Sequence, residues 1–122
     1  PLARKYGYSE EASAVALDKI VEIIRLIDNR LEDQERVGSK YLVGNSISAA
    51  DIYWSTMVMS TLPTPEEIMP RTEQNQGMLM WFEGNSKIPA IKEVLSNRIQ
   101  DHQHYILKNY CETPAILGGD LL

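Results

Sequence analysis

The sequence lacks most of the features that mark specialised classes of protein. Its 122 residues contain one cysteine, Cys111, so no disulfide can form within the chain and no CxxC motif is present. No apolar run approaches the roughly 20 residues of a membrane span, and no signal-peptide pattern is visible. Acidic residues outnumber basic ones, 17 against 12, which argues against nucleic acid as the main partner. We therefore expect a cytoplasmic protein that binds neither nucleic acid nor membrane.

Residues that could carry chemistry are also scarce. His102, His104 and Cys111 are the candidate soft-metal ligands, and the two histidines stand two positions apart, on different faces of a helix. The sequence contains no Gly-rich phosphate loop and no HExxH or GxSxG motif, and no nucleophile–base pair can be assigned. Because His102 falls on an apolar stripe, a hydrogen-bonded core histidine is its simplest interpretation. We predict no catalytic, cofactor-binding or metal-binding residue in this chain.

Helical periodicity extends over most of the sequence. From Ser9 to Arg36 an apolar stripe recurs with helical spacing, with Ser9 as a candidate cap and Gly38 as a stop. Further helices are expected over 49–60, over 73–82 and from Pro89 onward, the last continuing to Tyr110 or breaking near Asn97. No useful segment alternates apolar and polar residues. We predict one all-α domain, residues 1–122, of four to five helices around a buried central helix that starts near Ser48.

The start of that central helix is the best specified point of the sequence, in the stretch "YLVGNSISAADIYW" (41–54). Ser48 and Asp51 are spaced as a capping box, in which each side chain pairs with the other residue's backbone N–H. Ile47 and Ile52 are spaced for a hydrophobic staple around the same turn. Because the helix is apolar nearly all round, we expect it to be buried on all sides. These four residues are predicted to form a structural helix cap.

Two apolar patches allow two interpretations. "YWSTMVM" (53–59) and "MLMWF" (78–82) combine aromatic and methionine side chains. Such side chains pack a core, which is the simpler interpretation, and they also line ligand pockets. A substrate site in this chain, if it has one, is left unassigned by the sequence.

The segment from residue 41 to 51 resembles the helix-start signature of the C-terminal, all-helical domain of glutathione S-transferases. The pattern is [FY]-L-x-G-[DN]-x-[LIF]-[ST]-x-A-D, and the positions that match it are Tyr41, Leu42, Gly44, Asn45, Ile47, Ser48, Ala50 and Asp51. Weaker likenesses follow in the same order, in "LPTPEEIMP" (62–70), in Trp81 ahead of Pro89 and in "DHQHYILKNYCETP" (101–114). The resemblance extends over roughly residues 10–115.

The resemblance implies that the full protein has two domains with different roles. In that family a thioredoxin-like domain precedes the helical one, binds glutathione as co-substrate and supplies the catalytic residue. This sequence contains neither that domain nor the first of the family's two long helices. Because it begins with Pro1 and not with Met, we expect a processed product or a piece of a longer chain. The helical domain would then contribute structure and an apolar substrate pocket, in a homodimer. The alternative is a non-enzymatic interaction module, like the transferase-like domains of translation factors and aminoacyl-tRNA synthetases.

Overall fold

The structure, a computed structural model, describes residues 5–115. From Glu10 onward five α-helices and one 3-10 helix follow one another: α2 (Glu10–Arg36), α3 (Ala49–Met57), η1 (Val58–Ser60), α4 (Gln76–Ser86), α5 (Pro89–Val94) and α6 (Asn97–Tyr110). No strand occurs between residues 5 and 115. The all-α prediction is therefore confirmed for this part of the chain.

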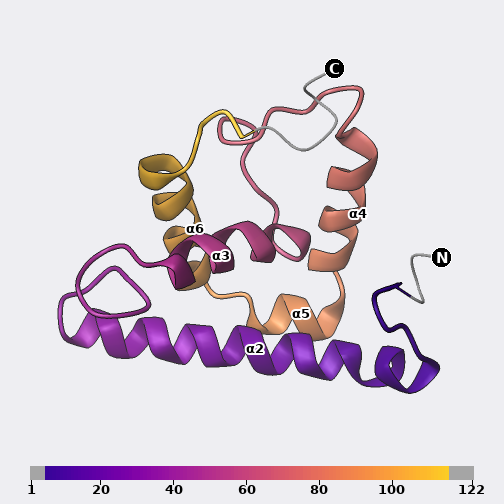
Figure 1. The fold of residues 1–122 in the computed structure, drawn as a ribbon, viewed down its shortest axis with the longest axis horizontal. Coiled ribbons are helices and arrows are strands. Elements are labelled where there is room, and N and C mark those ends of the chain that lie inside the picture. Colours follow the sequence, from indigo (N-terminus) through magenta and orange to yellow (C-terminus); the bar gives the residue numbers. More distant parts are fainter. Residues whose placement is uncertain (1–4, 116–122) are drawn as a thin grey trace.

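The long helix α2 forms one side of the molecule, and the other helices lie against it or above it (Figure 1). Its start is fixed by Ser9, whose hydroxyl accepts a hydrogen bond from the N–H of Ala12 at 3.0 Å. It ends just before Gly38, whose φ of 78° is a left-handed conformation that glycine adopts without strain. α5 and α6 both pack on α2. The predicted cap and stop are both confirmed.

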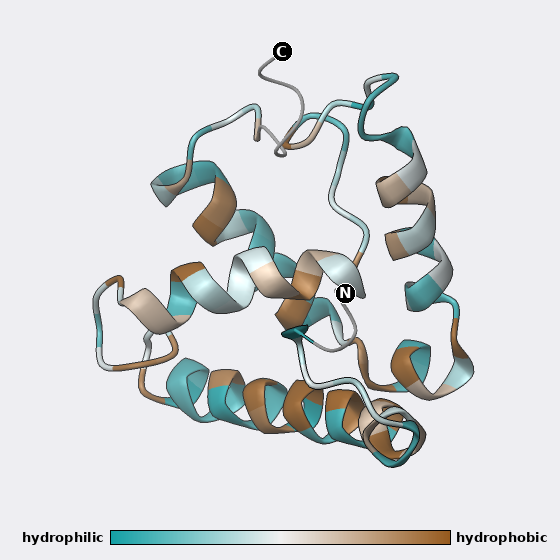
Figure 2. Ribbon diagram, turned by 45° about the vertical axis from the view of Figure 1, so that its right-hand side comes forward, coloured by the Kyte–Doolittle hydropathy of each residue, from teal (hydrophilic) through white to brown (hydrophobic). Residues whose placement is uncertain are grey.

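The core lies where α2, α5, α6 and η1 meet. Its buried members come from all four of these elements and from the loops between them: Ile24, Leu31, Leu42, Val58, Leu62, Ile91 and Ile99. Brown apolar positions alternate with teal polar ones along α2, as expected for a helix with one buried face (Figure 2). Ile20 and Ile23 belong to the predicted stripe, yet they are 36% and 50% exposed. The N-terminal half of α2 therefore extends beyond the elements that cover its C-terminal half.

The central helix α3 packs mainly on α6 and on η1. Asp51 and Ser55 on that side have no exposed surface, whereas Tyr53 and Met57 are each 70% exposed. The expectation of burial on all sides was therefore wrong. An apolar helix is buried only where other elements cover it, and no element among residues 5–115 covers the face that carries Tyr53 and Met57.

One helix starts later than expected, and another breaks in the way that one of the two expectations described. α4 begins at Gln76 instead of Glu73, because Asn75 and Thr72 close a turn first: Asn75 Oδ1 accepts from the Thr72 N–H at 2.8 Å. The expected helix from Pro89 divides into α5 and α6 at Leu95, whose ψ of 98° is extended. Ser96 then caps α6 by accepting from the N–H of Ile99 at 3.2 Å. The break falls within two residues of the predicted one.

Candidate functional site

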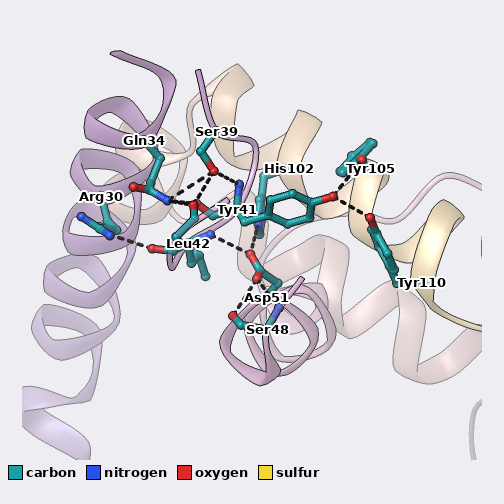
Figure 3. A network of polar contacts seen from close by, with 11 residues as sticks. Arg30, Gln34, Ser39, Tyr41, Leu42, Ser48, Asp51, His102, Tyr105 and Tyr110 are labelled. Atoms are coloured by element: carbon teal, nitrogen blue, oxygen red, sulfur yellow. Dashed lines mark hydrogen bonds and ion pairs between the residues drawn. The ribbon is translucent and has the colours of Figure 1, made fainter. Parts of the chain in front are cut away.

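A polar network joins the loop before α3, the first turn of α3 and the middle of α6 (Figure 3). At its centre is the carboxylate of Asp51, which has no exposed surface. Oδ1 accepts from the Leu42 N–H at 2.8 Å and contacts His102 Nε2 at 2.9 Å. Oδ2 accepts from the Ser48 N–H at 2.9 Å and from the Ser48 hydroxyl at 2.7 Å. One buried side chain therefore holds three segments of the chain together.

These contacts determine the protonation states of the buried pair. Burial acts to raise the pKa of Asp51, but the hydrogen bonds from Leu42, Ser48 and His102 outweigh it and lower that pKa below its usual value. Burial lowers the pKa of His102, and the nearby carboxylate offsets only part of the effect. At neutral pH the pair is therefore an ionised Asp51 and a neutral His102. Because a carboxylate only accepts, the proton of the neutral ring is on Nε2, and Nδ1 is left as an acceptor.

The loop between α2 and α3 is held by a second buried side chain, Gln34. Its amide donates to the carbonyl oxygens of Tyr41 at 2.7 Å and Gly44 at 2.6 Å, and it lies 3.3 Å from Ser39 Oγ. The Ser39 hydroxyl donates to the same Gly44 carbonyl at 2.6 Å. Gly44 itself has a φ of 63°, which favours glycine. The loop conformation that presents the Leu42 N–H to Asp51 is therefore built by side chains from the end of α2.

Three tyrosines meet beside this loop. The hydroxyl of Tyr41 lies 2.6 Å from that of Tyr110 and 3.3 Å from that of Tyr105. The hydrogen bonds that Tyr41 shares with Tyr105 and then with Tyr110 raise the pKa of Tyr41, and the bond with Tyr41 lowers the pKa of Tyr105. The ammonium of Lys40 stands 5.1 Å from the centre of the Tyr105 ring, at the edge of this cluster.

Beside the network is a pocket of about 270 Å³, between the C-terminal part of α2, the turn after it and α6. Its lining residues are Leu31, Glu35, Ser39, Lys40, Arg98, Asp101, His102 and Tyr105. A second pocket of about 230 Å³ lies between the loop of residues 63–71 and α4. The first pocket borders the buried pair, and it is the better candidate for a binding site.

The four residues predicted as a helix cap occupy the start of α3. Ser48 is the N-cap, and the two halves of a capping box are in place. The Ser48 side chain faces the Asp51 N–H without a well-aligned hydrogen bond to it, and its own proton goes to the Asp51 carboxylate. Ile47 is exposed and Ile52 is half-buried. The hydrophobic staple between them stays a prediction.

Sequence reasoning missed several partners in this region. It identified His102 as a core histidine, which the structure confirms, but not that Asp51 is its partner. It also missed Gln34, although a polar residue one turn beyond Leu31 on an apolar stripe is a signal of a buried hydrogen bond. The role of Arg98 was not predicted either: its guanidinium forms ion pairs with Glu35 and Asp28 of α2, each at 2.9 Å. Each missed contact joins residues on different elements, which local spacing does not reveal.

The network has the geometry of a structural site. Asp51 and His102 resemble the acid–base half of a catalytic triad, but the Ser48 hydroxyl points its proton at the carboxylate and not at the imidazole. Burial raises the pKa of Cys111, which keeps that thiol protonated and weakly nucleophilic. Of residues 5–115, no group of three or more His, Cys, Asp and Glu side chains is placed to hold a metal ion. The pocket, with its charged rim, is the part of this region suited to ligand binding.

Within the described part of the chain, none of the helices combines the length and apolarity required to cross a bilayer. Comparisons with protein-family models, with curated proteins and with solved structures find no significant match to this chain.

Proposed function

We propose that this chain is the helical domain of a glutathione S-transferase-like protein, in which a thioredoxin-like domain binds glutathione and carries out catalysis. The observation that supports a partner is a row of exposed apolar side chains along α2, between residues 15 and 26. Its members are Val15, Leu17, Ile20, Ile23 and Leu26, which are between 36% and 66% exposed. Large apolar side chains exposed in successive turns of one helix are candidates for an interaction surface.

The nature of the partner is inferred from the resemblance in residues 41–51. That signature specifies a capped helix, and the Asp51 network gives it a buried anchor in α6. Tyr53, Met57, Met80 and Trp81 are also more than 60% exposed, on α3 and α4. We propose that these side chains line an apolar substrate pocket once a second domain covers them, in a cytoplasmic homodimer that uses glutathione as co-substrate.

The test is the intact mass of the natural gene product, detected in its source cells with an antibody to this domain. The proposal expects a species heavier than 13.8 kDa by at least the mass of a domain, which binds glutathione in a calorimetric titration. A heavier species with no glutathione affinity would refute the enzymatic role. A species of 13.8 kDa would refute the two-domain form altogether.

The second candidate is a non-enzymatic interaction module, and the same exposed row on α2 supports it. In this case the row docks onto another helical domain and not onto a catalytic one. The substitution Leu26→Glu should abolish that association, whereas Glu22→Gln, four residues earlier on the same exposed side of α2, should leave it intact. Native mass spectrometry of the partner captured by Glu22→Gln, and absent with Leu26→Glu, distinguishes a thioredoxin-like partner from a helical one.

A further inference from the structure

The pocket beside the Asp51 network has an uneven distribution of charge. Four charged side chains line it, but Arg98 already pairs with Glu35 and with Asp28, each at 2.9 Å, so Arg98 and Glu35 are engaged within the protein. The other two are Lys40 and Asp101, which form no ion pair within 4 Å in the described part of the chain. The pocket therefore offers one available cation and one available carboxylate.

The remaining wall is apolar or aromatic. Leu31 is buried and forms part of the wall, and Tyr105 contributes its half-buried ring. Lys40 Nζ stands 5.1 Å from the centre of that ring, which places the cation directly beside the aromatic surface. A ligand that bound here would meet a hydrophobic surface and a positive charge side by side.

His102 also lines the pocket, and one of its ring nitrogens is a buried acceptor without a partner in the described part of the chain. Its side chain is 3% exposed, Nε2 is engaged by Asp51, and Nδ1 has no hydrogen-bond partner in the described part of the chain. A buried nitrogen without a partner is destabilising and needs an explanation. Because Nδ1 is an acceptor, a ligand N–H would satisfy it, provided the side chains that cover this nitrogen shift slightly.

We propose that this pocket binds a small zwitterion with an apolar side group, of the α-amino acid class. Its carboxylate would pair with Lys40, its ammonium with Asp101 and with His102 Nδ1, and its side group would lie against Leu31 and the Tyr105 ring. The volume of about 270 Å³ is near the lower end for ligand pockets, which suits an amino acid better than a larger molecule. This ligand site lies at the end of α2 opposite the exposed apolar row, and it does not depend on the proposed function.

The experiment compares three probes that share one phenyl ring, by calorimetric titration of the full chain. L-phenylalanine carries both charges, 3-phenylpropionate lacks the ammonium and phenethylamine lacks the carboxylate. We expect phenylalanine to bind most tightly, by about fivefold over either of the others, the upper range for one partly exposed ion pair. Equal affinity for all three probes, or no measurable binding of phenylalanine, would overturn the proposal.

Two variants assign the charges to the pocket. Lys40→Gln should weaken the binding of phenylalanine and 3-phenylpropionate but not that of phenethylamine. Asp101→Asn should weaken the binding of phenylalanine and phenethylamine but not that of 3-phenylpropionate. Both side chains are exposed, so neither substitution should destabilise the folded protein. As an independent readout, the imidazole nitrogen NMR signal of His102 should move with phenylalanine and phenethylamine but not with 3-phenylpropionate. Variants that affected all three probes alike would place binding elsewhere on the molecule.

Discussion

Removal of the Asp51 carboxylate should destabilise this protein far more than the loss of an ordinary helix cap. In Asp51→Ala the Ser48 N–H and hydroxyl are half-buried and can turn partly to water, so the cap itself accounts for about 1 kcal/mol. The Leu42 N–H and His102 Nε2 are buried, and each loses its acceptor. A buried donor left without a partner costs about 1–3 kcal/mol. We therefore expect a loss of at least about 3 kcal/mol in the free energy of unfolding.

Urea denaturation followed by circular dichroism measures this loss. With a slope of about 1.5 kcal/mol per molar urea, a loss of 3 kcal/mol lowers the midpoint by about 2 M. Ser48→Ala, which removes only the hydroxyl, should lower it by about one third as much. Asp18→Ala, at an exposed position of α2, controls for the loss of a negative charge. If Asp51→Ala shifted the midpoint no further than Ser48→Ala, the contacts to Leu42 and His102 would not be stabilising.

Three further substitutions probe neighbouring parts of the network. Burial lowers the pKa values of His102 and His104 in the folded protein. As pH falls, these histidines are therefore protonated in the unfolded chain before they are protonated in the folded one. The free energy of unfolding should decrease below about pH 6.5 for this reason. His102→Gln and His104→Gln should each flatten that decrease, and an unchanged pH dependence of stability in either variant would contradict a lowered pKa for that histidine. Gln34→Ala should lower the free energy of unfolding by about 1–2 kcal/mol in urea titration, against no change for the exposed Gln74→Ala. Gly44→Ala should lower the free energy of unfolding by about 1 kcal/mol. The loss would come from backbone strain alone, because no atom lies within 4 Å of the added Cβ. An unchanged thermal midpoint would exclude such strain.

How far the sequence predicts this fold depends on whether the decisive contacts are local. The cap of α2 at Ser9, the stop at Gly38 and the pairing of Ser48 with Asp51 involve residues within a few positions of each other. Their spacing alone was therefore sufficient to predict them. The contact between Asp51 and His102 joins residues 51 positions apart. Each member could be recognised as buried, but nothing local states that the two meet.

The exposure of α3 shows the opposite limit. Its composition is apolar nearly all round, and composition reports how much surface a helix would benefit from burying. It does not report which neighbours are present to cover that surface. α6 and η1 cover the side with Asp51 and Ser55, while Tyr53 and Met57 stay exposed. The pocket escaped prediction for a related reason, because its wall combines the end of α2, a turn and α6.

The stabilising network and the candidate pocket share Ser39, His102 and Tyr105, but the central groups of the network are engaged by the fold. Asp51 uses both carboxylate oxygens for four donors, and the Gln34 amide is engaged by the loop carbonyls. Groups that are fully engaged in the fold have no capacity left for a substrate. The groups that remain available are the exposed apolar side chains of α2, α3 and α4, the charges of Lys40 and Asp101 at the pocket, and Nδ1 of His102. Substitutions in the network should therefore change stability, whereas substitutions at the exposed positions among these should change binding at constant stability.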